Sequence, residues 1–121
     1  MYSPDIKIGC VSNVYCRMMH FVKKGDIEMG HSHPFDHLSL LANGSVEVTI
    51  DSITTTFKAP HMIFIKKDKE HEIKALEDNS LIYCIHALRD GFGVGDIIDP
   101  DSIPKGIEVL EDVNPVTHYR D

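Results

Sequence analysis

The sequence has no long apolar run and few cysteines, and its first residues do not predict a basic leader. No uncharged apolar stretch approaches the roughly 20 residues that a membrane-spanning helix requires, so no such helix is expected. The start, MYSPDIKIGC, lacks a basic segment followed by an apolar run, so we expect no secretory signal. Cys10, Cys16 and Cys84 are an odd number without paired spacing. This usage favours reduced thiols in a cytoplasmic protein over a disulfide framework.

Positive charge is also scarce. The 121 residues hold 12 Lys and Arg against 19 Asp and Glu, a formal net charge of −7. Residues 1–87 hold 9 basic and 11 acidic side chains (−2), whereas residues 88–121 hold 3 and 8 (−5). Phosphate contacts supply most nucleic-acid affinity, so an acidic chain without a basic stripe argues against a nucleic-acid partner.

The pattern that the sequence does contain is a hydrophobic period of two between residue 6 and about residue 88. SVEVTI (45–50) places Val46, Val48 and Ile50 on one face, and NGS (43–45) is a hairpin-type turn between HLSLLA and that strand. Further β-rich runs follow at about ten-residue spacing: ITTTFKA, MIFIK, HEIKAL and LIYCIHAL. Short strands separated by turn residues predict a single all-β sandwich or barrel over residues 1–88.

After Arg89 the composition changes. The segment DGFGVGDIIDPDSIPKGIEVLEDVNPV is rich in Gly, Pro and Asp. Its glycine run does not follow a parallel βα pattern, so it is not a nucleotide-binding loop. We expect residues 89–121 to form an irregular acidic extension packed on the barrel within the same domain. A substrate lid or a contact with a partner chain are the alternatives.

The stretch HSHPFDH (31–37) concentrates three histidines and an aspartate. If HLSLL is a strand starting at His37, then His37, Ser39 and Leu41 share a face. His31 and His33 are two apart, so an extended segment points both the same way. His71 opens the later run HEIKAL. A surface loop is the simpler interpretation, but imidazoles converging from neighbouring strands at roughly 2.0–2.2 Å are what a metal in a β-barrel requires.

The spacing of these residues resembles a known motif. Gly25, five residues, His31-x-His33, three residues, His37, six residues and Gly44 resemble the first cupin motif, G-x5-H-x-H-x3,4-E-x6-G, with histidine in place of glutamate at position 37. In the second motif His71 matches, but Lys66, Asp68 and Ala75 replace the usual Pro, Gly and Asn. The similarity covers about residues 15 to 88 and is greatest to small single-domain cupins with a four-histidine site.

This resemblance implies a cupin jelly roll, a double-stranded β-helix, with one divalent transition metal per chain. The implied ligands are His31, His33, His37 and His71. Four neutral imidazoles leave the 2+ charge uncompensated, which favours Lewis-acid chemistry and anionic or enolate-type ligands. Octahedral geometry leaves two open positions, enough for a bidentate substrate or for substrate plus O₂. Imidazole suits Fe, Mn, Ni, Cu and Zn alike, so the sequence does not select the metal.

Three further residues are candidates for roles beside the metal. Asp36 is flanked by ligands and is expected to accept a hydrogen bond from an imidazole N–H. His20 alternates with Cys16 and Met18, and it lies near the site if that face is the interior. The resemblance suggests that the Tyr83 side of its strand faces the cavity, which makes Tyr83 a candidate proton donor or substrate contact.

These residues predict a metal-dependent enzyme, with dioxygenase-type oxidation (an oxidoreductase) favoured over isomerase or lyase chemistry on a small polar or anionic molecule. A non-catalytic module that binds a metal or a small molecule is one alternative. A metal-independent sugar isomerase or epimerase is another, although the sequence reveals no acid–base pair for it.

We also expect a homodimer. If His37 faces the pocket, Leu38 and Leu40 face outward, and YCRMMHFV is apolar on both of its faces. Exposed apolar stripes tend to mark an interface, and two-fold symmetry is the commonest arrangement. The alternative is that the acidic tail covers these residues within one chain.

Overall fold

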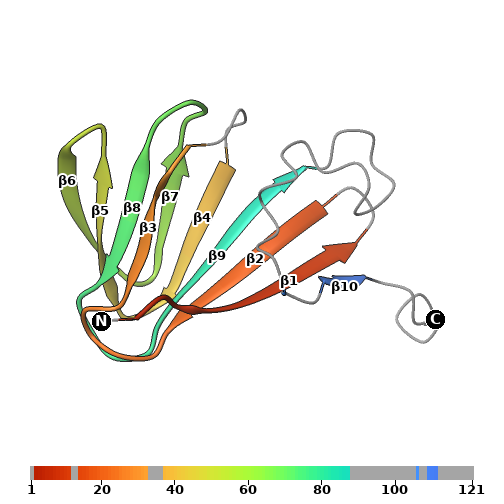
Figure 1. Ribbon diagram of the computed structural model, residues 1–121, viewed down its shortest axis with the longest axis horizontal. Helices are drawn as coiled ribbons and strands as arrows, with labels where there is room; N and C mark the ends of the chain where they lie inside the picture. Colours follow the sequence, from red (N-terminus) through yellow and green to blue (C-terminus); the bar gives the residue numbers. More distant parts are fainter. Residues whose placement is uncertain (1, 12–13, 33–36, 88–105, 107–108, 112–121) are drawn as a thin grey trace.

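The computed structural model describes residues 2–11, 14–32, 37–87, 106 and 109–111 (Figure 1). The regular structure of these residues is entirely β-strand, and they include no helix that could cross a membrane. The expected all-β class is therefore confirmed. The strands are β1 (Asp5–Val11), β2 (Val14–Phe21), β3 (Ile27–His31), β4 (His37–Asn43), β5 (Ser45–Ile50), β6 (Ile53–Lys58), β7 (His61–Ile65), β8 (His71–Ala75), β9 (Ser80–Ala87) and β10 (Val109–Glu111).

The strands form two sheets. Sheet A has the order β10-β1-β2-β9-β4-β7, and sheet B has the order β3-β8-β5-β6. In Figure 1 sheet B lies to the left, and sheet A fans out from β7 and β4 to β10 at the right. From β1 to β9, consecutive strands lie in different sheets except at the β1–β2 and β5–β6 hairpins. This winding is that of a double-stranded β-helix.

Two tight turns show how local sequence shapes the barrel. The β5–β6 hairpin closes through Asp51 and Ser52, both at positive φ (48° and 69°), as a two-residue primed turn requires. The predicted turn at NGS is present, with Gly44 at φ 81°. The strands on either side of it do not pair with each other, because β4 lies in sheet A and β5 in sheet B. The expected hairpin is therefore a crossover between sheets.

The core follows the period-two pattern of both sheets. One row across sheet A aligns Met19, Ile82 and Leu41, each at most 2% exposed. Sheet B contributes Val46 and Val48 from β5, together with Ile73 and Ala75 from β8, and these are also almost fully buried. These side chains fill one end of the barrel.

The C-terminal segment contributes one strand. β10 runs parallel to β1, with Ile8 paired to Val109 and Cys10 paired to Glu111. Residues 109–111 thus extend the edge of sheet A and are not irregular, as was expected for the whole extension. Residues 88–105, 107–108 and 112–121 lie outside the described part of the chain. The packing of the extension on the barrel stays a prediction.

Candidate functional site

Two of the predicted metal ligands meet inside the barrel. His37 begins β4 in sheet A and His71 begins β8 in sheet B, and they are only 8% and 4% exposed. Their ring centroids are 5.4 Å apart with an interplanar angle of 56°. Ser39 and Leu41 are fully buried on the same face of β4 as His37, which confirms the expected orientation of that strand. The two rings therefore come together from opposite sheets.

The geometry of this pair fits a shared metal ion. Two imidazole nitrogens that bind one ion at about 2.0–2.1 Å have ring centres roughly 5 Å apart. The Nδ1 atom of His71 lies 3.2 Å from the carbonyl oxygen of Lys69. A carbonyl oxygen only accepts, so Nδ1 donates and the lone pair of the neutral ring lies on Nε2. His71 is thus held in a tautomer that leaves one nitrogen available as a ligand.

The turn before His71 is held by contacts with the neighbouring hairpin. Asp68, in place of glycine, has φ 60°, a conformation that aspartate tolerates better than most residues. The Nζ of Lys69 lies 2.9 Å from the carboxylate of Asp51, and the backbone N–H of Asp51 donates to the carbonyl of Glu70 at 3.1 Å. These contacts tie the turn to the β5–β6 hairpin and position the start of β8.

The remaining predicted ligands are described only in part. The Cα of His31 pairs with that of His71 in the β3–β8 ladder, after a register shift that follows Glu28. The side chain of His31 and the whole of His33 and Asp36 lie outside the described residues. Within the described part of the chain, no group of three or more His, Cys, Asp or Glu side chains could hold a metal. The four-histidine centre stays a prediction, with two of its members placed together.

A buried ion pair that the sequence analysis missed lies deeper in the barrel. Nη2 of Arg17 on β2 lies 2.6 Å from Oε2 of Glu28 on β3, and these side chains are 12% and 11% exposed. Arg17 aligns with Cys84 and through it with Ser39, which is two residues from His37 on β4. Two residues along a strand span about 7 Å, so the ion pair lies about 7 Å from the histidines along the strands, farther into the barrel. Arg17 alternates with the buried Met19, which is the signal that could have revealed it.

Other polar groups share this end of the barrel. The rings of Tyr15 and His86 pack with centroids 4.4 Å apart. Burial raises the pKa of Tyr15 well above its usual range. Burial also raises the pKa of Cys84 to about 11, although Ser39, at 3.3 Å from its sulfur, opposes the shift. Both groups therefore keep their protons at neutral pH.

Two candidate residues lie on the wrong side of sheet A. In β9 the buried residues are Ser80, Ile82 and His86, so the period of two directs Tyr83 to the outer face, and the expectation that it faces the cavity is wrong. His20 also lies on the outer face, because the intervening Met19 points into the core. Nε2 of His20 lies 3.1 Å from Oδ1 of Asn79, away from the metal ligands.

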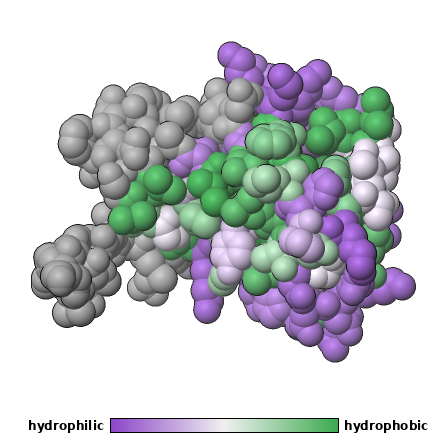
Figure 2. Space-filling model, turned by 180° about the vertical axis from the view of Figure 1, so that it is seen from behind, coloured by the Kyte–Doolittle hydropathy of each residue, from purple (hydrophilic) through white to green (hydrophobic). Residues whose placement is uncertain are grey.

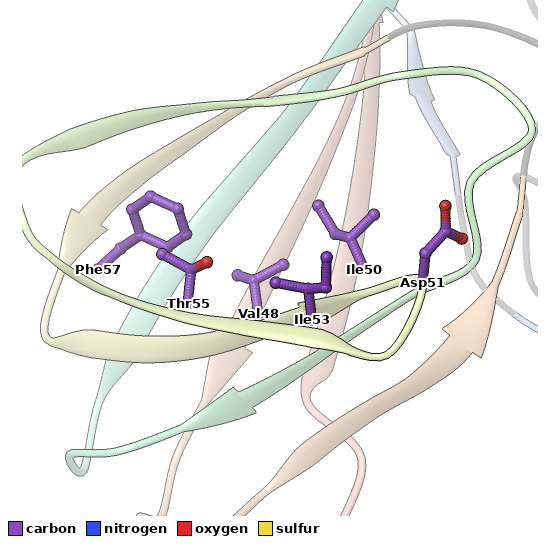
Figure 3. Close-up of a pocket in the computed structure, with 6 residues that line it drawn as sticks. All are labelled: Val48, Ile50, Asp51, Ile53, Thr55 and Phe57. Carbon is purple, nitrogen blue, oxygen red and sulfur yellow. The ribbon is translucent and has the colours of Figure 1, made fainter.

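A pocket of about 280 Å³ lies against the β5–β6 hairpin. In Figure 3 its six lining side chains rise from the hairpin toward the same side. They are Val48, Ile50, Asp51, Ile53, Thr55 and Phe57. Ile50 pairs directly with His71, so the pocket adjoins the histidine pair. Its size suits a small molecule, and its wall is mainly apolar.

Comparisons with known proteins agree on the fold. No family model and no curated protein sequence matches the chain. Its structure is similar to that of a conserved double-stranded β-helix protein from Klebsiella pneumoniae (TM-score 0.62, 17% identity, covering 70% of this chain and 76% of that one). It is also similar to KdgF from a Halomonas species (0.61, 19%, 68% and 76%) and to a cupin superfamily protein from Desulfitobacterium hafniense (0.60, 14%, 72% and 81%). The chain therefore has the cupin fold, an all-β double-stranded β-helix.

Proposed function

We propose that this small cupin is a metal-dependent enzyme that holds one divalent transition metal through His31, His33, His37 and His71. The observation that carries the proposal is the buried contact between His37 and His71 from opposite sheets, with the proton of His71 fixed on Nδ1. Of the possible reactions, dioxygenase-type oxidation ranks ahead of isomerase or lyase chemistry.

A metal in this position would supply Lewis acidity and open coordination positions to a bound anionic group. The chain itself would bind the remainder of the substrate. Val48, Ile50, Ile53 and Phe57 offer an apolar wall beside His71, so we propose a small anionic molecule with an apolar portion. The apolar portion would displace water from this wall, while the anionic group points toward the histidines. The Thr55 hydroxyl is a polar contact within the same wall.

A non-catalytic binding module is the second candidate. It is favoured by the outward position of Tyr83, which removes the proposed proton donor from the cavity. Tyr15 does not replace it readily, because it is 2% exposed and its raised pKa keeps its proton bound. A metal-independent isomerase needs an acid and a base that both reach the substrate, and this burial of Tyr15 weighs against it.

Elemental analysis of the full chain, purified without added metal, tests the proposal. We expect one transition metal per chain, and its loss in the variant His37→Ala/His71→Ala. His20→Ala is the matched control, because that histidine lies on the outer face. A double variant that keeps the metal content of the wild type would overturn the site. A retained metal without O₂ uptake, across a panel of small carboxylates with apolar tails, would select the binding module over the oxidative enzyme.

A further inference from the structure

Arg17 and Glu28 form a charged pair inside the barrel, apart from the hydrophilic surface of the molecule. Figure 2 shows hydrophilic residues around an apolar middle on one face, whereas both side chains of this pair are almost buried. Another buried carboxylate, that of Asp26, accepts hydrogen bonds from the backbone N–H groups of Tyr2 and Lys23. Those bonds give Asp26 a structural role, but they have no equivalent at Arg17.

The guanidinium of Arg17 has a donor that the protein does not use. A guanidinium carries five N–H donors in a planar fork. Its Nη2 lies 2.6 Å from Oε2 of Glu28, but its buried Nε has no hydrogen-bond partner among the described residues. An unsatisfied buried donor is destabilising, most of all on a charged group, and calls for an explanation such as a bound ligand. A turn about the last bonds of the side chain would bring Nε–H to an incoming acceptor while Nη2 keeps its contact.

The register of sheet B connects this ion pair with the pocket at the β5–β6 hairpin. Glu28 pairs with Ile73, and Ile73 pairs with Val48, which lines the pocket (Figure 3). All three are buried, so they form one inward row across three strands that spans about 10 Å. His71 lies two residues from Ile73, on the same face of β8. A ligand with its apolar end at Val48 and its polar end at Arg17 therefore passes the histidine pair.

We propose that Arg17 binds the carboxylate of the ligand and so selects small carboxylic acids with an apolar portion over their neutral analogues. This rests on the proposed function, since it names the residue that receives the anionic end of the same ligand. Guanidinium and carboxylate form charge-assisted hydrogen bonds, which a neutral amide does not match. The carboxylates of Glu28 and of the ligand would share one guanidinium through different N–H groups.

Titration of the full chain with isobutyrate, followed by NMR, tests the proposal. The signal of the Arg17 side-chain Nε–H, assigned by its loss in Arg17→Lys, reports on the guanidinium itself. We expect a saturable shift of this signal with isobutyrate and none with isobutyramide, which has the same shape without the charge. Arg17→Lys keeps the charge but lacks the planar fork, so isobutyrate affinity, read from the amide signals of Ser39 and Cys84, should fall about tenfold or more. Lys58→Met removes an exposed positive charge and should bind like the wild type.

A second variant and two states of the protein make the outcome decisive. Arg17→Met/Glu28→Leu removes the pair together, so it should keep the β circular dichroism spectrum and lose the saturable shifts. The titration is run on zinc-loaded and on chelated protein, because Arg17 is not among the proposed metal ligands. A chain that takes up no zinc but whose Arg17 signal responds to isobutyrate supports this proposal and refutes the metal site. An unresponsive Arg17 signal in zinc-loaded protein, or an equal response to the amide, would overturn the proposal and leave the metal site standing.

Discussion

Replacing Glu28 by glutamine tests the importance of the ion pair inside the barrel. The variant Glu28→Gln keeps the shape of the side chain but leaves the guanidinium of Arg17 without its counterion. Both side chains are nearly buried, at 12% and 11% exposure. Nε of Arg17 has no hydrogen-bond partner within the described part of the chain, so the contact with Glu28 is the main compensation for its buried charge. We therefore expect a large loss of stability.

The expected size of this loss follows from the burial of the pair. Removing one partner of a buried ion pair costs about 3–5 kcal/mol, whereas an exposed pair contributes at most about 1 kcal/mol. The slight remaining exposure places Glu28→Gln near the lower figure, about 3 kcal/mol. An unfolding entropy of about 2.1 cal/mol/K per residue converts this to a Tm lower by roughly 12 °C. Arg17→Met/Glu28→Leu removes both charges and should lie within about 1 kcal/mol of the wild type.

Thermal and urea unfolding followed by circular dichroism measure these differences. Lys69→Met is the control, because Lys69 and Asp51 form an ion pair at 2.9 Å with side chains 50% and 46% exposed. It should change the free energy of unfolding by less than about 1 kcal/mol. If Glu28→Gln is no more destabilising than Lys69→Met, or if the double variant is less stable than Glu28→Gln, the reasoning is refuted.

Three further predictions concern a turn, a thiol and the metal. Gly44→Ala should destabilise the protein more than Gly25→Ala: both glycines have positive φ, but only at position 44 would a Cβ meet backbone, 2.8 Å from the Cα of Ser80. Equal melting temperatures for the two variants would contradict this. Folding raises the pKa of the Cys84 thiol to about 11, so the thiol stays protonated at pH values where it would ionise in the unfolded chain. The free energy of unfolding should therefore fall as pH rises from about 9 toward 11, and it should fall less in Cys84→Ala. A pH profile unaffected by that substitution would count against it. Chelated protein should keep its β circular dichroism and melt at a lower temperature, and metal affinity should weaken as pH falls toward about 6, because imidazole must be neutral to bind. Collapse to random coil on chelation, or pH-independent affinity, would speak against the proposed site.

The sequence determined the runs that form β4 to β9 and the faces of those whose pattern is one-sided. Val46 and Val48 are buried as the alternation predicted, and so are Ser39 and Leu41. This succeeds because the direction of successive side chains in a strand is a local property of the backbone. In β2 the pattern was ambiguous, since both of its faces are apolar.

Only the packing of the two sheets decided which face of such a strand is inside. Met19 entered the core, which placed His20 on the outer face, and the burial of Ile82 did the same for Tyr83. The turn at Gly44 was likewise predicted, but not its consequence, because β4 pairs with β7 and β9 rather than with β5. Strand pairing depends on contacts between distant segments, which local patterns do not contain.

The candidate site divides in the same way. Motif spacing selected His31, His33, His37 and His71 from the eight histidines, because a metal-binding motif restricts residue types at fixed intervals. The ring centroids of His37 and His71 lie 5.4 Å apart because sheet A packs against sheet B, and the ion pair between Arg17 and Glu28 depends on the same packing. Each of these contacts joins residues from different sheets. The sequence therefore determined which histidines could act together, and the tertiary structure alone decided that His37 meets His71 and that Arg17 meets Glu28, because only folding brings the two sheets face to face.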